Sequence, residues 1–209
     1  MKLDWKKTDK AFYLPKTEPE RITVPAFRFF TIRGEGNPNE PLFQEYIGVL
    51  YSLAYTVRMS PKSGTAPEGY REYTVFPLEG VWDVSEAAKA TGFQKLDKST
   101  LVFTMMIRQP DFVTSAYASS VVDQVARKKP SPLLERVRFE TIEEGECVQM
   151  THIGPYDAES ASFERMEEFC AAHSLRRASK LHREIYMSDP RKVSPEKMRT
   201  VLRFQVREA

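Results

Sequence analysis

A strand and a turn can be read directly from Gly145-Glu146-Cys147-Val148-Gln149-Met150-Thr151-His152-Ile153-Gly154-Pro155. The apolar and β-branched residues predict a strand over Gly145 to His152, and Gly154-Pro155 predicts the turn that ends it. Helical spacing follows in an apolar stripe: Phe163, Met166, Cys170 and His173. Two more strands are expected over Leu181 to Met187 and Thr200 to Val206. This half therefore indicates a strand–helix–strand–strand unit.

The first half shows the same order of elements. After an extended polar lead-in of about 20 residues, a strand is predicted over Ile22 to Ile32, ending at the turn signal Gly34-Glu35-Gly36-Asn37-Pro38-Asn39. A helix is then indicated by the apolar stripe Phe43, Tyr46, Leu50 and Leu53. Two strands are expected after it, over Glu72 to Leu78 and Leu101 to Gln109. Between those strands, Asp83 to Thr91 is expected to be a short helix or loop. At an offset of 120 residues Gly34 falls on Gly154 and the two helical stripes coincide, which favours an internal duplication.

The predicted fold class is α+β, built from tandem, pseudo-twofold duplicated modules with antiparallel sheets and covering helices. Within a single domain spanning 1–209, we expect a first module over 22–112 and a second over 142–209. Residues 113–141 form the helical connector and lead-in between them. Modules placed side by side would form a cleft at their join, and such joins are common ligand sites.

Composition narrows the classes of function. The 31 basic and 29 acidic residues give a formal net charge of +2, which argues against a dedicated nucleic-acid binder. The first residues carry charges where a signal peptide needs an apolar core, and no apolar run approaches the roughly 20 residues that span a bilayer. We expect a cytoplasmic protein without membrane or direct nucleic-acid partners. Both cysteines fall in apolar patterns, which favours buried free thiols.

The most informative segment for chemistry is His182-Arg183-Glu184-Ile185-Tyr186-Met187-Ser188-Asp189-Pro190. Alternation on a strand places His182, Glu184 and Tyr186 on one face. Because the apolar residues of the next strand should pack on the helix, we expect Glu184 and Tyr186 to point across the open face of the sheet. A carboxylate there can pair with a cation, accept a ligand donor or act as a base. The alternative is an ordinary solvated strand glutamate.

Aromatic residues supply the other candidates. The run from Glu72 to Trp82 contains Tyr73, Phe76, Glu79 and Trp82, and Pro77 within it suggests an edge or bulge that can re-aim side chains. Trp82 is a flat wall for a planar ligand or simply a core residue. Tyr55 lies on the first helix, away from its apolar stripe. It borders the same cleft or belongs to an amphipathic surface.

Two ligand-contact candidates, His152 and Tyr156, flank the Gly154-Pro155 turn. The chain has three histidines and no paired spacing among them, so no metal site is predicted. No nucleophile elbow, phosphate loop or dinucleotide fingerprint is present. We therefore expect no cofactor.

The order of these motifs resembles the GyrI-like small-molecule-binding proteins, in their stand-alone branch. The resemblance runs from about Trp5 to Val206, and it also rests on Ile107-Arg108-Gln109-Pro110-Asp111-Phe112-Val113 and Cys147 to Asp157. It implies the bacterial multidrug effector-binding fold, with a cleft lined by aromatic residues and a glutamate on the strand that holds Glu184. In multidrug-sensing regulators of this family that glutamate meets lipophilic cations.

Some stand-alone members hydrolyse cyclopropane-containing, DNA-alkylating natural products. The resemblance thus implies catalytic roles for Glu184 and Tyr186 and ligand contacts for the remaining candidates. The expected partner is a small hydrophobic aromatic or cationic molecule. Three functions remain open: a hydrolase that uses glutamate-activated water, a non-catalytic binder that sequesters such compounds, and a gyrase-inhibitor-type protein-binding module.

Overall fold

The computed structural model describes residues 2–85 and 97–209. The chain divides into two compact units. The first contains Met1–Asp4, Phe27–Leu78 and Trp82–Ile142, and the second contains Trp5–Ala26, Glu79–Val81 and Glu143–Ala209. Each unit combines an antiparallel sheet with helices, so the α+β fold class is confirmed.

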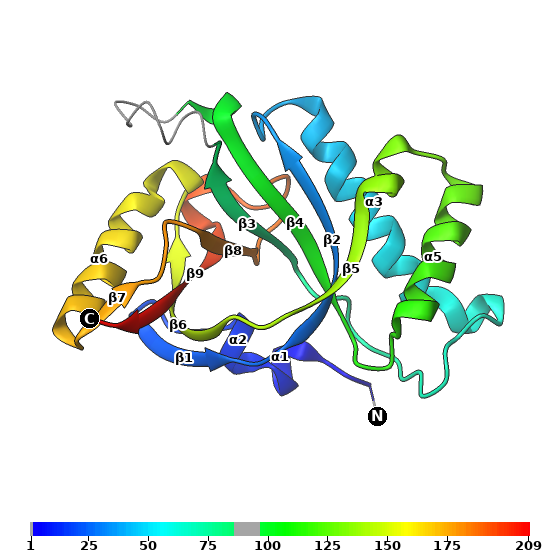
Figure 1. The fold of residues 1–209 in the computed structure, drawn as a ribbon, viewed down its shortest axis with the longest axis horizontal. Helices are drawn as coiled ribbons and strands as arrows, with labels where there is room; N and C mark the ends of the chain where they lie inside the picture. Colours follow the sequence, from blue (N-terminus) through cyan, green and yellow to red (C-terminus); the bar gives the residue numbers. More distant parts are fainter. Residues whose placement is uncertain (1, 86–96) are drawn as a thin grey trace. The chain divides into compact units, whose positions relative to one another are not determined.

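The sheet of the first unit has the strand order β3-β4-β2-β5. Its strands are β2 (Phe27–Glu35), the end of β3 (Leu78–Val84), β4 (Leu101–Gln109) and β5 (Val137–Ile142). Two long helices accompany it, α3 (Pro41–Met59) and α5 (Ser115–Lys128), and three 3-10 turns, η1 (Ser60–Ser63), η2 (Lys98–Thr100) and η3 (Pro132–Arg136). Figure 1 shows α3 and α5 packed beside each other in this unit.

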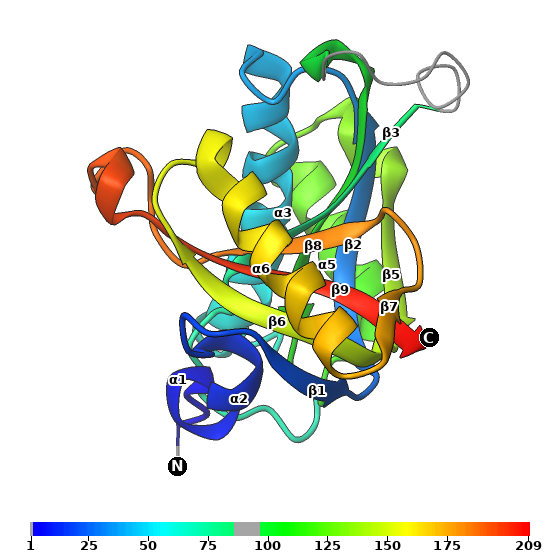
Figure 2. The same cartoon turned by 90° about the vertical axis from the view of Figure 1, so that its left-hand side faces the viewer.

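The sheet of the second unit has the order β1-β6-β9-β8, with β7 pairing β9. Its strands are β1 (Glu20–Val24), β6 (Gly145–Ile153), β7 (Leu175–Arg177), β8 (His182–Tyr186) and β9 (Arg199–Glu208). The remaining elements are the short helices α1 (Trp5–Thr8) and α2 (Lys10–Tyr13), the helix α6 (Glu159–Ala172), and the turns η4 (Tyr156–Ala158) and η5 (Pro195–Lys197). Figure 2 shows α6 lying across β6 and β9.

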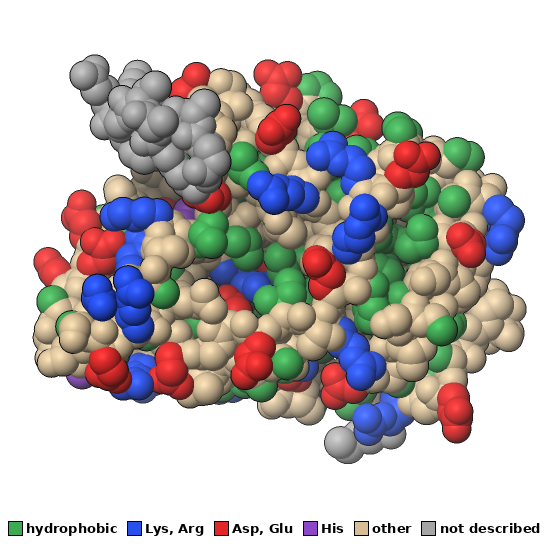
Figure 3. All heavy atoms as spheres, viewed as in Figure 1, with side chains coloured by type: hydrophobic (Ala, Val, Ile, Leu, Met, Phe, Trp, Pro, Cys, Tyr) green, Lys and Arg blue, Asp and Glu red, His purple; other side chains and the backbone are tan. Residues whose placement is uncertain are grey.

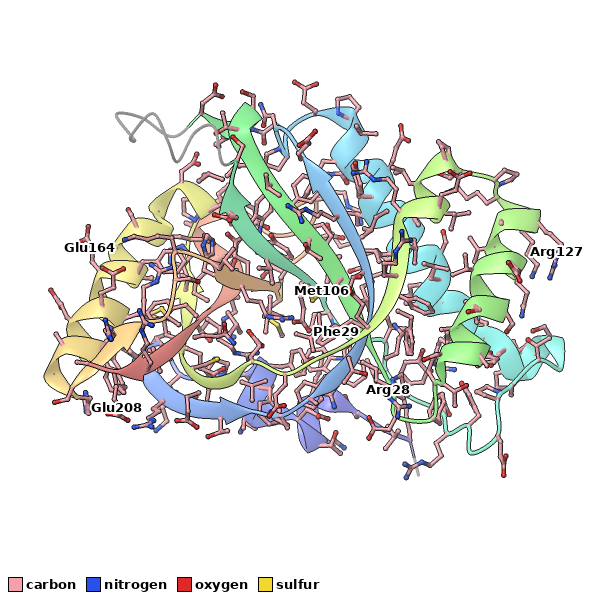
Figure 4. All side chains as sticks on the ribbon, viewed as in Figure 1. Arg28, Phe29, Met106, Arg127, Glu164 and Glu208 are labelled. Atoms are coloured by element: carbon pink, nitrogen blue, oxygen red, sulfur yellow. The ribbon has the colours of Figure 1, made fainter. Side chains whose placement is uncertain are left out.

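The apolar core of the second unit lies between α6 and one face of this sheet. Met166 and Cys170 of α6 pack against Leu202 and Phe204 of β9 and against Val148 of β6. Both cysteines of the chain are free and buried, as predicted. On the outer sides of the helices, Figure 4 shows Arg127 of α5 and Glu164 of α6 directed away from the sheets.

Three predicted elements differ from the structure, and a fourth lies mostly outside the described residues. The strand expected over Ile22 to Ile32 is two strands, β1 and β2, because Pro25 has no N–H to donate and interrupts the ladder. The lead-in contains α1 and α2. The strand expected over Glu72 to Leu78 begins only at Leu78, after Pro77. The helix or loop expected over Asp83 to Thr91 falls mostly outside the described residues.

Candidate functional site

Three polar side chains of β8 share one face, as the alternation predicts. Tyr186 donates its hydroxyl hydrogen to Glu184 Oε2 at 2.8 Å. On the other oxygen, His182 Nε2 lies 3.1 Å from Glu184 Oε1, and it donates there in the tautomer that carries the proton on Nε2. Glu184 is only 9% exposed. Glu184 is therefore a buried carboxylate held by two side chains of its own strand.

The face that carries Glu184 is the one covered by α6. Glu184 pairs with Leu202 in the β8–β9 register, and Tyr186 pairs with Thr200. Paired residues of antiparallel strands share a face, and Leu202 belongs to the core beneath α6. Phe163 of α6 stacks edge-on against His182 with ring centroids 4.8 Å apart. The expectation that Glu184 and Tyr186 point across the open face is therefore wrong.

The opposite face is closed by a buried ion network. Arg183 lies 2.6 Å from Glu79 Oε2 and 2.9 Å from Glu144 Oε1, and Arg203 lies 2.9 Å from Glu144 Oε2. Burial acts to raise the pKa of Glu144, but the guanidinium groups of Arg183 and Arg203 hold it below its usual value. Glu79, a predicted ligand contact, is 1% exposed and also accepts a hydrogen bond from Tyr13.

The N-terminal segment reaches this network through its backbone. Gln149 donates to the carbonyl oxygen of Ala11 at 2.7 Å, and Thr151 donates to that of Pro15 at 2.8 Å. Arg203 also donates to the carbonyl oxygen of Phe12. The segment that the sequence predicts to be an extended lead-in thus satisfies buried donors of β6 and β9.

A second carboxyl group, that of Glu159, lies beside Glu184. Glu159 is the first residue of α6 and is 6% exposed. Burial, followed by the charge of Glu184 and a hydrogen bond with it, raises the pKa of Glu159 to about 10. These effects outweigh the helix dipole, which favours a carboxylate in the first turn. These effects therefore favour the protonated form of Glu159.

Two polar atoms next to this pair are unsatisfied. Glu159 Oε1 and Thr200 Oγ1 are buried and have no hydrogen-bond partner in the described part of the chain. Buried polar atoms of this kind are usually satisfied by a protein group or an ordered water. These two oxygen atoms can therefore still form hydrogen bonds, for example to a ligand or a water molecule.

Tyr156 borders the same group of residues. Its ring meets that of Tyr186 edge to face, with centroids 5.9 Å apart. Burial and then the charge of Glu184 raise the pKa of Tyr156 to about 12. The ring remains 39% exposed, so it offers an accessible aromatic surface beside the buried carboxylate.

His152 holds the turn that leads into α6. Its Nε2 lies 3.2 Å from the carbonyl oxygen of Pro155, and its Nδ1 lies 2.9 Å from Ser162 Oγ. Because a carbonyl oxygen can only accept, Nε2 donates, and in a neutral ring Nδ1 accepts from the Ser162 hydroxyl. The 5% exposed His152 therefore fixes the position of the first turn of α6, where Glu159 lies.

The other predicted ligand contacts belong to the first unit. Tyr73, Phe76 and Trp82 are buried there. Tyr73 donates to the carbonyl oxygen of Ala54, the Arg108 guanidinium lies 4.5 Å from the Phe76 ring centroid, and Trp82 packs against the Phe43 and Phe103 rings. Tyr55 is 53% exposed and lies 6.2 Å from the Tyr51 ring.

The surface of the described residues has two hollows, and its acidic and basic side chains are interspersed. The second unit has a hollow of about 410 Å³ lined by residues that include Cys170, Arg176 and Lys180, and the first unit has one of about 460 Å³ that includes Arg58 and Tyr70. Figure 3 shows acidic and basic side chains interspersed over the face in view. In the described residues, no group of three or more His, Cys, Asp or Glu side chains is arranged to hold a metal ion. None of the helices described is both long and apolar enough to cross a membrane.

A family model for the GyrI-like small molecule binding domain matches residues 17–207. This chain belongs to the GyrI-like family. No curated protein matches this GyrI-like chain. A solved hydrolase from Listeria innocua is 38% identical, with a TM-score of 0.88, and the match covers 98% of this chain and all of that one. A second hydrolase structure from Listeria innocua is 40% identical, with a TM-score of 0.90, and covers 99% of this chain and all of that one.

A more distant similarity concerns the fold alone. The C-terminal domain of EcmrR is 12% identical to the GyrI-like chain, with a TM-score of 0.53, and the match covers 92% of this chain and 98% of that domain. The family and the two hydrolases thus agree with the resemblance expected from the sequence. They support a GyrI-like small-molecule-binding protein whose close structural relatives are called hydrolases.

Sequence reasoning missed two features of this GyrI-like site. One is Glu159, whose signal is an acidic residue opening a helix directly after a strand and turn. The other is the ion network of Arg183, Glu144 and Arg203. Its signal is an arginine with apolar neighbours inside a strand, as Arg203 has between Leu202 and Phe204 in β9, because a buried charge requires an oppositely charged partner.

Proposed function

We propose that this protein hydrolyses small electrophiles, specifically cyclopropane-containing, DNA-alkylating compounds, with Glu184 as the base that activates water. The observation that carries the proposal is the buried carboxylate of Glu184, held by Tyr186 and His182. Arg183, the neighbouring cation, lies on the other face with Glu79 and Glu144. A desolvated carboxylate without a guanidinium partner keeps its capacity to accept a proton.

The chemistry needs only one water and no cofactor. The carboxylate of Glu184 accepts a proton from the water as its oxygen forms a bond to a ring carbon. The strained carbon–carbon bond breaks, and its electron pair moves onto a conjugated carbonyl oxygen of the substrate. The hydroxyl of Tyr186, on turning from Glu184 to the substrate, or another hydroxyl donor stabilises that developing oxyanion. The oxyanion takes up the proton from Glu184, directly or through solvent, which restores the carboxylate.

The names of the relatives support hydrolysis as the reaction class, but they do not name a substrate. Two structures of about 40% identity are called hydrolases. The cyclopropane substrate class comes from the stand-alone branch that the sequence resembles. Tyr156 is proposed to contact the aromatic body of the ligand, since its exposed ring lies next to Tyr186. A protein with this activity would protect DNA by acting in the cytoplasm.

The second candidate function is capture without turnover. It is favoured by the same juxtaposition of a buried carboxylate and the Tyr156 and Tyr186 rings. A carboxylate supplies charge pairing for a lipophilic cation, and aromatic faces supply cation–π attraction of about 0.5–2 kcal/mol. A protein of this kind would sequester or sense toxic compounds.

Stoichiometry and one substitution separate these functions. A spirocyclopropyl dienone is incubated in large excess over the wild-type protein and over the variants Glu184→Gln and Glu164→Gln, and products are followed by liquid chromatography and mass spectrometry. A hydrolase converts many equivalents to a product heavier by one water, and Glu184→Gln lowers the rate at least about 100-fold. The exposed control Glu164→Gln retains the rate. Protection of a single equivalent indicates capture, and an unchanged rate in Glu184→Gln refutes the mechanism.

A further inference from the structure

His182 holds one oxygen atom of the Glu184 carboxylate. Its Nε2 lies 3.1 Å from Glu184 Oε1, and the two side chains are only 23% and 12% exposed. A bare imidazole nitrogen and a carboxylate oxygen are both acceptors and would repel each other at this distance, so we assign the imidazole hydrogen to Nε2. A hydrogen bond from this N–H to an ionised carboxylate is stronger than one between neutral groups. The contact therefore fixes the position of Glu184 Oε1.

Phe163 of α6 restrains the imidazole ring of His182. The two rings meet edge to face, with centroids 4.8 Å apart and an angle of 70° between their planes. Phe163 is itself held in place, because its ring stacks on that of Phe204 at 6.5 Å and the Arg177 guanidinium lies 5.5 Å from its centroid. Edge-to-face ring pairs and cation–π contacts both favour a defined orientation of the rings. The ring of Phe163 therefore limits the rotation of His182 away from Glu184.

The two oxygen atoms of Glu184 have different surroundings. Oε1 accepts from His182, whose ring is covered by Phe163. Oε2 accepts from the Tyr186 hydroxyl at 2.8 Å, and the Tyr186 ring lies beside the exposed ring of Tyr156. A carboxylate oxygen has two acceptor sites, so Oε2 can accept a proton from water beside the Tyr186 hydroxyl or after that hydroxyl has turned to the substrate. Oε2 is thus the oxygen on the side where a ligand ring can be contacted.

We propose that His182 and Phe163 are positioning residues for Glu184. His182 retains Glu184 Oε1 throughout the reaction, and Glu184 Oε2 is the atom that accepts the proton from water. Phe163 acts through His182, by keeping Nε2 directed at the carboxylate. The inference deepens the proposed function and rests on it for the role of Glu184 as the base. Neither positioning residue needs to contact the substrate.

The first test reads the position of the imidazole hydrogen and needs no ligand. Proton–nitrogen correlation spectra of the wild type at pH 8 report which ring nitrogen of each of the three histidines carries the hydrogen. We expect Nε2 for His182. His173 is the internal control, because its Nδ1 lies 2.7 Å from the carbonyl oxygen of Phe169 and must donate there. A hydrogen on Nδ1 of His182 overturns the proposal, whether or not any substrate is turned over.

The second test uses two amides that differ in reach. In His182→Gln the amide nitrogen takes about the place of Nε2 and can still donate to Glu184, whereas in His182→Asn it takes about the place of Nδ1 and cannot. For hydrolysis of the cyclopropane substrate, we expect kcat to fall at least about tenfold in His182→Asn and by less than about threefold in His182→Gln, with KM little changed in both. Equal losses in the two variants, or no loss in His182→Asn, contradict the proposal.

Should His182→Asn fail to fold, Phe163→Leu provides the alternative, with Phe169→Leu as its matched control. Both phenylalanines lie on α6, pack against the same core and contact a histidine ring. We expect Phe163→Leu to lower kcat severalfold and to shift the imidazole signals of His182, while Phe169→Leu leaves both unchanged. The same loss of kcat in both variants overturns the role of Phe163. If the wild type does not consume the substrate, the proposed function fails, and the spectra still decide whether His182 holds Glu184.

Discussion

Arg183 and Glu184 are neighbours on β8, yet their buried charges lie on opposite faces of the sheet. Arg183 contacts Glu79 and Glu144 on one side, and Glu184 contacts Tyr186 and His182 on the other. Adjacent strand residues point in opposite directions, so the cation nearest in sequence cannot neutralise the carboxylate. This separation keeps the guanidinium group of Arg183 away from Glu184, as the proposed role of Glu184 requires.

Removal of Arg183 should destabilise the protein strongly. The variant Arg183→Met leaves Glu79 and Glu144 buried with one cation fewer, and breaking a buried ion pair typically costs about 3–5 kcal/mol. Urea unfolding at pH 7 measures the loss. The control Arg191→Met removes an arginine that pairs with Asp189 while its side chain is 84% exposed, and it should cost less than about 1 kcal/mol. Equal losses in both variants would show that the buried network contributes nothing beyond a surface pair.

The hydroxyl of Tyr186 should matter for catalysis. The variant Tyr186→Phe keeps the ring beside Tyr156 but removes the donor to Glu184 Oε2. A hydrogen bond to a charged group contributes about 1.5–3 kcal/mol, so kcat/KM for the proposed substrate should fall by about 10- to 100-fold. The control Tyr117→Phe removes a buried hydroxyl without a partner in the described chain and should leave the rate unchanged. Wild-type kinetics in Tyr186→Phe would remove this tyrosine from the mechanism.

Gly34 should not tolerate a side chain. A Cβ atom at this position would overlap the Phe103 ring and lie 2.9 Å from Tyr46 Cζ, and overpacking of this kind typically costs about 1–3 kcal/mol. We expect Gly34→Ala to lower the thermal midpoint by several degrees. Gly48→Ala is the matched control, because it lies within α3 with no atom within 4 Å of its added Cβ. It should leave the midpoint unchanged or raise it. A lower midpoint in Gly48→Ala than in Gly34→Ala would contradict this explanation.

Regular periodicity allowed several elements to be predicted. The strand expected over Leu101 to Gln109 coincides with β4, and Phe163, Met166 and Cys170 of the helical stripe lie on α6. The fourth residue of the stripe, His173, is exposed and follows the last residue of α6. The turn expected over 34–39 begins at Gly36, with φ of 108°, whereas Gly34 at its start still lies within β2. The glycine at position 34 is required by two aromatic rings from other elements, and a local pattern contains no information about such rings.

The shared face of three β8 side chains was predicted correctly, but the identity of that face was not. Alternation correctly placed His182, Glu184 and Tyr186 together. The choice of face depended on the register of β8 with β9, which aligns Glu184 with the apolar residue Leu202. The prediction assumed that polar and apolar residues occupy separate faces of the sheet. Glu184 departs from this rule because its hydrogen bonds with Tyr186 and His182 compensate for its burial on the apolar face. Glu159 enters the site only through the packing of α6.

The attachment of the N-terminal segment has a consequence for how this sequence can vary. Gln149, Thr151 and Arg203 bind the segment at the carbonyl oxygens of Ala11, Pro15 and Phe12, which every amino acid possesses. The identities of those three residues can therefore drift in evolution while the path of the backbone is retained. Conservation is instead expected at Gln149, Thr151 and Arg203, whose side chains donate the hydrogen bonds that hold the segment.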